Sequence, residues 1–151
     1  MSDLNPKSTL QIAGHPIHPM IIPFPIVFFV STFVVDLTYL SRGDRTWALA
    51  AMWLLGAGLT MAALAALAGL TDFLGDRRIR NIKDAWLHMI GNVVAVLIEA
   101  VNLYLRWSQG AERAVAPGGV VLSGVVVLLL LFTGWKGWEL VYRHRVGIAE
   151  R

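Results

Sequence analysis

The sequence contains no cysteine and few charged residues. Of its 151 residues, 15% are Asp, Glu, Lys or Arg. The absence of cysteine excludes disulfides, thiolate metal sites and iron–sulfur clusters ligated by this chain. A soluble domain usually carries roughly 25% charged residues, whereas 56% of this chain is hydrophobic. A chain of this length cannot hide so much apolar surface in its own core, so the composition indicates a membrane protein.

Motifs of common enzymes are also absent. There is no phosphate-binding loop, no nucleophile elbow and no serine paired in sequence with a recognisable base. The sequence therefore selects no reaction and favours a protein without classical enzymatic activity. The net charge of +3 is explained by basic residues that flank membrane spans, so we expect no nucleic-acid partner. Residues 1–14 lack the apolar centre of a signal peptide, and the first apolar segment is expected to be retained.

Four segments are long and apolar enough to cross a bilayer, which requires about 20 residues each. They cover residues 20–40, 47–70, 86–105 and 120–142. The intervening segments are short, and the last of them, 106–119, contains the helix breakers Gly110, Pro117, Gly118 and Gly119. We therefore predict an all-α fold: residues 1–151 form one transmembrane four-helix bundle with both termini on the same side.

The distribution of basic residues predicts which side that is. The side of the termini carries Lys7, Arg77, Arg78, Arg80, Lys83, Lys136, Arg143, Arg145 and Arg151, which is nine of the 13 Lys and Arg residues. The opposite side carries the remaining four, Arg42, Arg45, Arg106 and Arg113. Cytoplasmic segments of membrane proteins are enriched in Lys and Arg, so the termini are expected in the cytoplasm.

All four histidines fall on the side of the termini. His15 and His18 lie in the sequence Gly-His-Pro-Ile-His-Pro, where each proline disfavours a helical conformation of the residue before it. In polyproline geometry, which repeats every three residues, both imidazoles would point the same way into the bundle. The alternative is a stiff lead-in whose histidines face lipid headgroups.

A haem or metal site is one interpretation of this end of the bundle. His18 and His88 are the first candidates as ligands of haem b, followed by His15 and His144, because histidines of different helices hold haem iron within bundles. A transition metal is the alternative cofactor, because it accepts imidazole and carboxylate ligands. Its candidate ligands are His15, His18, Asp72, His88 and Glu139. Glu139 is also spaced to pair with Lys136 on its own helix.

The deepest acids, Asp36 and Glu99, suggest a second site near the opposite side. Together with Asn102 they are candidates for a proton path, because acids within membrane spans are costly and commonly functional. No basic residue is predicted in the same layer, so at least one acid is expected to be protonated or hydrated. The structural alternatives are hydrogen bonds between helices and pairing of Asp36 with Arg42 or Arg106.

Internal repetition is weak in the sequence. The first and third spans each begin near a histidine and carry an acid further along, but no convincing repeat is visible. The second span carries small residues at Gly58, Ala62, Ala65 and nearby positions, a pattern that allows close helix packing.

Several motifs resemble a known family. The segments 14–20 (GHPIHPM), 23–25 (PFP), 69–73 (GLTDF) and 134–144 (GWKGWELVYRH), with Asp36, His88 and Asn92, resemble the bacterial membrane-protein family catalogued as domain of unknown function 2231. The resemblance covers nearly the whole chain. Two positions depart from it: Trp138 stands where a small residue is usual, and Arg145 where glycine is common.

The resemblance implies a multi-pass protein of the bacterial cytoplasmic (inner) membrane, without a settled activity. Some relatives are joined to Rieske-type domains, which implies redox or respiratory membrane proteins as partners beside the lipid bilayer. Three functions therefore remain open: a haem- or metal-binding redox subunit, a non-catalytic accessory or assembly protein, and a proton or small-solute transport component. Transport through four spans would require a homo-oligomer.

Overall fold

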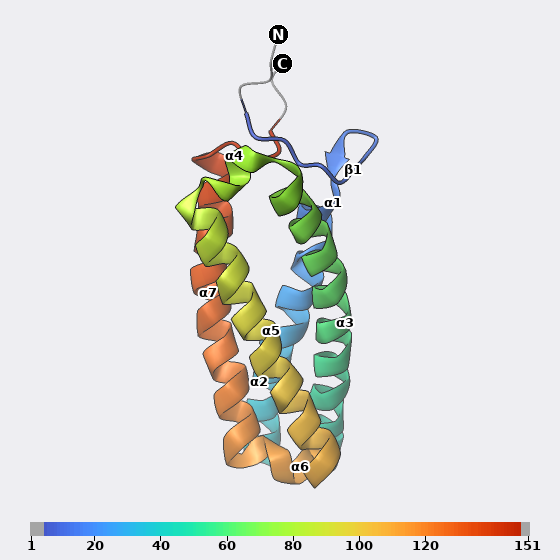
Figure 1. Cartoon of the computed structure of the whole chain (residues 1–151). Coiled ribbons are helices and arrows are strands. Elements are labelled where there is room, and N and C mark those ends of the chain that lie inside the picture. Colours follow the sequence, from blue (N-terminus) through green and yellow to red (C-terminus); the bar gives the residue numbers. More distant parts are fainter. Residues whose placement is uncertain (1–4, 149–151) are drawn as a thin grey trace.

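A computed structural model describes residues 5–148, which are almost entirely helical. Four long helices form an elongated bundle (Figure 1): α2 (Pro23–Arg42), α3 (Arg45–Gly75), α5 (Lys83–Gln109) and α7 (Val120–Tyr142). Shorter elements precede or join them: β1 (Gln11–Ile12), β2 (His15–Pro16), α1 (Ile17–Ile21), α4 (Arg77–Arg80), α6 (Ala111–Ala114) and η1 (Val115–Gly119). The two strands pair antiparallel. The predicted all-α four-helix fold is confirmed.

The four spans are longer than the sequence predicts. The apolar helical spans cover Ile17–Arg42, Arg45–Gly75, Lys83–Gln109 and Ala111–Tyr142, and each contains one predicted segment. The predicted connection over 106–119 is largely helical: α5 continues to Gln109, and the non-helical backbone of Ala116 marks a kink between α6 and α7. The chain turns at Gly110, whose positive φ of 92° glycine tolerates best, and α6 begins at the next residue.

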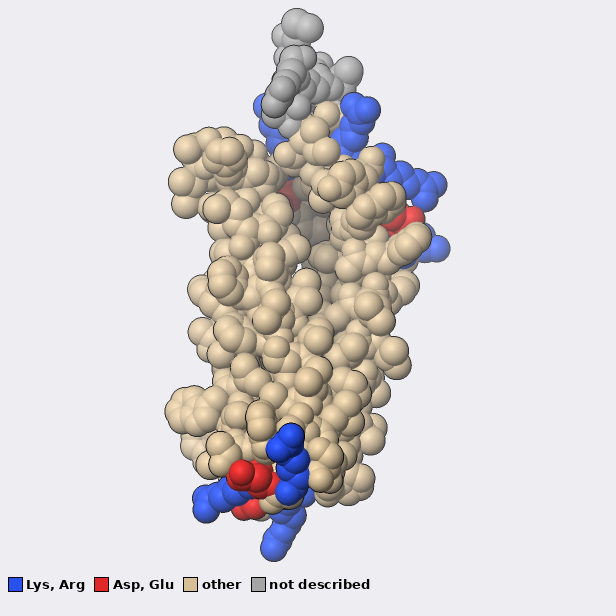
Figure 2. All heavy atoms as spheres, turned by 180° about the vertical axis from the view of Figure 1, so that it is seen from behind, with Lys and Arg blue, Asp and Glu red and all other residues tan. Residues whose placement is uncertain are grey.

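The outer surface of the bundle is rich in large apolar side chains, and its interior contains polar and charged ones. Large hydrophobic side chains such as Trp53, Leu67 and Leu128 are strongly exposed, whereas the largest fully buried side chain is Arg106. Figure 2 shows Lys and Arg side chains gathered at the two ends, with an almost uncharged surface between them. This distribution matches a protein whose middle lies in hydrocarbon and whose ends lie at the headgroups.

Both described ends of the chain lie at the same end of the bundle (Figure 1). The Asn5 side chain donates a hydrogen bond to the Ile148 carbonyl at 3.2 Å, and Gly147 N donates to the Pro6 carbonyl at 2.9 Å. We call this the terminal end, and the opposite end, where α6 lies, the α6 end. Arg151 falls outside the described residues.

The four helices pack as two hairpins that repeat one another. α2 packs on α3 and α5 packs on α7, while α2 also contacts α7 and α3 contacts α5. The buried residues of α2 are Pro25, Phe29, Thr32 and Asp36, and each has a buried counterpart in α5 exactly one repeat later, at Ala95, Glu99, Asn102 and Arg106. The repeat is 70 residues, the separation of Asp36 and Arg106. These contacts describe two halves related by an approximate two-fold axis along the bundle.

Candidate functional site

Two histidines from the two halves meet between the helices at the terminal end. His18 belongs to α1 and His88 to the first turns of α5, and their positions correspond in the 70-residue repeat. Their ring centroids are 6.2 Å apart and the ring planes are almost perpendicular, at 89°. The tertiary structure therefore brings the first two ligand candidates of the sequence into one pair.

Each imidazole is held by a backbone carbonyl of the neighbouring helix in its own half. Nδ1 of His18 lies 2.8 Å from the Ala65 carbonyl oxygen on α3, and Nδ1 of His88 lies 2.8 Å from the Thr133 carbonyl oxygen on α7. A carbonyl can only accept, so each Nδ1 carries the proton and donates it. The lone pair of each ring is consequently at Nε2, which can accept a hydrogen bond or coordinate a metal.

A glycine makes room for each of these hydrogen bonds. Gly69 lies one turn after Ala65, and a Cβ atom there would come within 2.9 Å of the His18 ring. Gly137 lies one turn after Thr133, and its Cβ atom would lie 3.1 Å from the His88 ring. Both glycines occur four residues after the accepting carbonyl, so the two halves hold their histidines in the same arrangement.

The two Nε2 atoms have different surroundings. Asn92 Nδ2 donates to His88 Nε2 at 3.3 Å, while Asn92 Oδ1 accepts from the Thr133 hydroxyl at 3.2 Å. His18 Nε2 has no hydrogen-bond partner among the described residues, yet it is not among the fully buried unpartnered atoms. It therefore faces accessible space. Figure 2 shows the bundle hollowed between its helices towards the terminal end.

His15 does not join the pair. The structure places His15 in strand β2, where it is exposed, and His18 in helix α1, which begins immediately after Pro16. The prediction of a polyproline segment with both imidazoles on one side is therefore wrong. Pro16 occupies the extended N-cap position of α1 and Pro19 lies in its first turns, where a missing N–H costs little.

Asp72 secures the segment that precedes α1. Its carboxylate accepts from the Ser8 hydroxyl at 2.9 Å and from the backbone N–H groups of Thr9 and Leu10 at 2.7 and 2.9 Å. With these donors in place, Asp72 acts as an anchor that fixes the approach of the chain to His18. Nearby, Asp76 accepts from Lys7 N and from the Arg78 side chain, and these contacts hold the pKa of Asp76 well below its usual value.

Glu139 and His144 belong to a network of ion pairs between α5 and α7. Lys136 Nζ lies 3.0 Å from Asp84 Oδ1 and 2.7 Å from Glu139 Oε2, which confirms the predicted Lys136–Glu139 pair. His144 Nε2 lies 2.9 Å from Asp84 Oδ2. This network ties the two helices of the second half together at the headgroup level.

The predicted five-residue metal cluster is thus divided among four separate places. Within residues 5–148, no group of three or more His, Asp or Glu residues is arranged to hold a metal ion. What remains as a ligand site is the pair of His18 and His88, with one imidazole from each half.

The α6 end holds a buried polar network that the sequence identified only in part. Arg106 forms a two-pronged ion pair with Asp36, at 2.9 and 2.7 Å, and both side chains are fully buried. Ser123 donates to Asp36, Arg106 Nε donates to Asn102 Oδ1, and Asn102 Nδ2 donates to Glu99 Oε2 at 2.9 Å. The expectation that no base lies in this layer is wrong, because α5 continues past the predicted end of the span, whereas the alternative pairing of Asp36 with Arg106 is confirmed.

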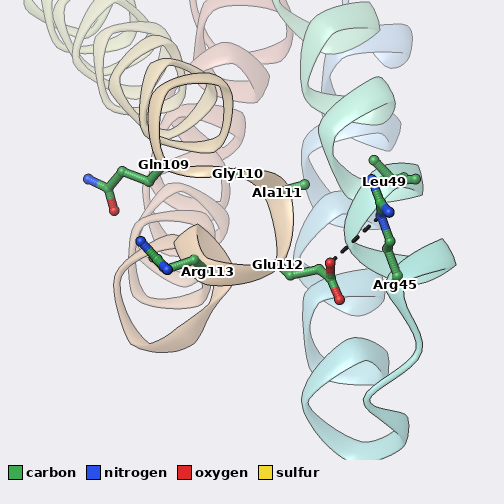
Figure 3. Close-up of a pocket in the computed structure, with 7 residues that line it drawn as sticks. All are labelled: Arg45, Leu49, Gln109, Gly110, Ala111, Glu112 and Arg113. Atoms are coloured by element: carbon green, nitrogen blue, oxygen red, sulfur yellow. Dashed lines mark ion pairs between the residues drawn. The ribbon is translucent and has the colours of Figure 1, made fainter.

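A shallow pocket lies beyond this network at the outer surface of the α6 end (Figure 3). It lies between the first turn of α3 and the turn into α6 and is lined by Arg45, Leu49, Gln109, Gly110, Ala111, Glu112 and Arg113. Arg45 and Glu112 point toward one another at 3.7 Å and are largely exposed. Exposed pairs of this kind contribute about 0–1 kcal/mol to stability.

Sequence reasoning missed the residues that position the histidines. Ala65 and Thr133 act through backbone carbonyls, which no residue type reveals. Gly69 and Gly137 were visible within the family motifs, but their contact with an imidazole requires the packed helices. The 70-residue recurrence of buried positions relates His18 to His88, but it can be recognised only when the buried faces of α2 and α5 are known.

The fold and the site define a multi-pass membrane protein built as a four-helix bundle of two hairpins, with a histidine pair between them. The chain belongs to the predicted membrane protein family DUF2231, whose family model matches residues 14–150. That match includes both histidines, both glycines and the whole buried network. No curated protein and no solved structure matches the chain.

Proposed function

We propose that this protein is a haem-binding membrane protein in which His18 and His88 are the two axial ligands of one haem b. The observation that carries the proposal is the paired imidazoles, each with Nδ1–H bound to a carbonyl. Outer hydrogen bonds of this kind fix the tautomer and orientation of metal-bound histidines. The two imidazoles, with ring centroids 6.2 Å apart, would together hold the iron of the haem.

The number of protein donors favours haem over a bare metal ion. Haem iron receives four nitrogens from the porphyrin and needs only two axial ligands from the protein. A structural zinc site requires four protein ligands, and Asp72 and Glu139 are already committed to other partners. A haem in this position would supply one-electron chemistry, consistent with a redox or respiratory membrane partner. We place the site on the cytoplasmic side of the bacterial inner membrane, following the excess of Lys and Arg at the terminal end.

An absorption spectrum of the detergent-purified protein, oxidised and reduced, tests the proposal. The wild-type protein should show a six-coordinate haem spectrum that is lost in His18→Ala and His88→Ala. His15→Ala and His144→Ala are matched controls and should retain it, because one residue is exposed on β2 and the other pairs with Asp84. Elemental analysis of the same samples separates haem iron from a non-haem metal. A colourless, metal-free protein that remains folded would contradict both the haem and the metal versions.

An accessory or assembly role is the second candidate, and the same hydrogen bonds favour it. His18 joins α1 to α3, and His88 joins α5 to α7, so each ring also ties helices together. In that case His18→Ala and His88→Ala should lower the amount of protein in the membrane without removing any cofactor spectrum. Measuring both quantities on the same variants distinguishes the two functions.

A further inference from the structure

The buried network at the α6 end contains one acid more than it has bases. Asp36 and Arg106 neutralise each other through two short contacts. The remaining guanidinium nitrogen, Nε, donates to Asn102 rather than to Glu99. Glu99 is therefore an additional carboxyl group inside the bundle, with no base of its own.

Glu99 is poorly provided with hydrogen-bond donors. The side chain is fully buried, Oε2 accepts one bond from Asn102 Nδ2, and Oε1 is the buried side-chain atom that lacks any partner within the described residues. An ionised carboxylate of low exposure normally accepts several hydrogen bonds. Burying it with a single donor costs several kcal/mol, so the neutral acid is the less costly form.

The neighbouring elements supply no further charge. The charged groups facing Glu99 are Asp36 on α2 and Arg106 on α5 itself, while α7 contributes the neutral Ser123. The buried residues of α3 at this end are apolar: Ala48, Ala51 and Leu55. Since Arg106 is already balanced by Asp36, ionisation of Glu99 would leave a net negative charge in the buried core.

We propose that Glu99 is a proton-binding site within the membrane, with the proton held on its carboxyl group. Asn102 links this group to both Ser123 and Arg106, and through them to Asp36. The network gives the site a hydrogen-bonded connection towards the α6 end. Asp36 and Asn102, predicted as members of a proton path, serve here as the counterion of Arg106 and as the connecting amide. This site lies apart from the histidine pair and does not depend on haem binding.

Infrared spectroscopy of the full-length purified protein tests this site. A protonated carboxyl group has a carbonyl stretch separate from those of carboxylates and amides. We expect this band in the wild-type protein at neutral pH, its loss in Glu99→Gln, and its retention in the control Glu112→Gln, because Glu112 is a largely exposed acid paired with Arg45. Glu99→Gln keeps the shape of the side chain and its acceptor for Asn102.

A second measurement covers the case in which Glu99→Gln does not fold. Wild-type protein labelled with 13C only in the glutamate carboxyl groups should show an isotope shift of the same band, which excludes Asp36 as its source. The absence of a protonated carboxyl band at neutral pH, or a band that persists in folded Glu99→Gln, would overturn the proposal. A band that does not shift with labelled glutamate would overturn it equally.

Discussion

Replacing Asp36 by Asn leaves the Arg106 guanidinium inside the bundle without its counterion. Removing one partner of a buried ion pair costs about 3–5 kcal/mol. Arg106 lies only three residues before the end of α5 at Gln109, a rise of about 5 Å, so a released Arg106 can extend towards the headgroups. We therefore expect Asp36→Asn to lower the free energy of unfolding by about 3 kcal/mol, near the lower limit.

The reverse substitution, Arg106→Met, should cost more. The short Asp36 side chain cannot reach the surface and keeps only the Ser123 hydroxyl as a donor. The Asp36 carboxylate would stay inside the bundle without its counterion, so the loss in the free energy of unfolding should lie near the upper limit of about 5 kcal/mol.

The double variant Asp36→Leu/Arg106→Met separates pairing from packing. Replacing a whole buried ion pair by apolar side chains is often neutral or stabilising, so this variant should lie within about 1 kcal/mol of wild type. Unfolding in a detergent titration, followed by tryptophan fluorescence, measures all variants. Arg45→Met is the control, because its exposed pair with Glu112 is worth about 0–1 kcal/mol. Additive losses in the double variant, or a smaller loss in Arg106→Met than in Asp36→Asn, would refute the reasoning.

Two further predictions concern the terminal end. Gly69→Ala should push the His18 ring from its carbonyl, lower the free energy of unfolding by about 1–3 kcal/mol and abolish any spectrum that depends on His18. The control is Gly56→Ala on the same helix, because a Cβ atom there meets nothing within 4 Å. It should be neutral or slightly stabilising in thermal unfolding. Because the Arg78 side chain lowers the pKa of Asp76 in the folded protein, the stabilisation from Asp76 should be fully present above about pH 4 and disappear as the pH falls below it. Wild type and Asp76→Asn should consequently differ at pH 7 and converge in acid; a difference independent of pH would contradict this assignment.

The pattern of apolar runs along the sequence was sufficient to predict the architecture of the bundle. Apolar runs of about 20 residues have one stable solution in a bilayer, a helix whose backbone groups are satisfied internally. An even number of membrane crossings then places the two ends of the chain, and all four histidines, on the same side of the membrane. His18 and His88 could be selected as ligand candidates for the same reason, since residue type and depth were enough.

The partners of those residues were decided by tertiary packing. Arg106 was assigned to the connection between spans because Gly110, Pro117 and two further glycines follow it, yet α5 continues to Gln109 and Arg106 turns inward to Asp36. The carbonyls of Ala65 and Thr133 are common to every residue type, so no sequence pattern could assign them to the imidazoles. The repeat of the two hairpins is hidden in the sequence because equivalent positions carry residues of different charge or polarity, such as Asp36 and Arg106 or Phe29 and Glu99. The sequence by itself determined how the chain crosses the membrane. The contacts between the two halves decided which polar groups neutralise one another, because burial and pairing depend on distance in space rather than along the chain.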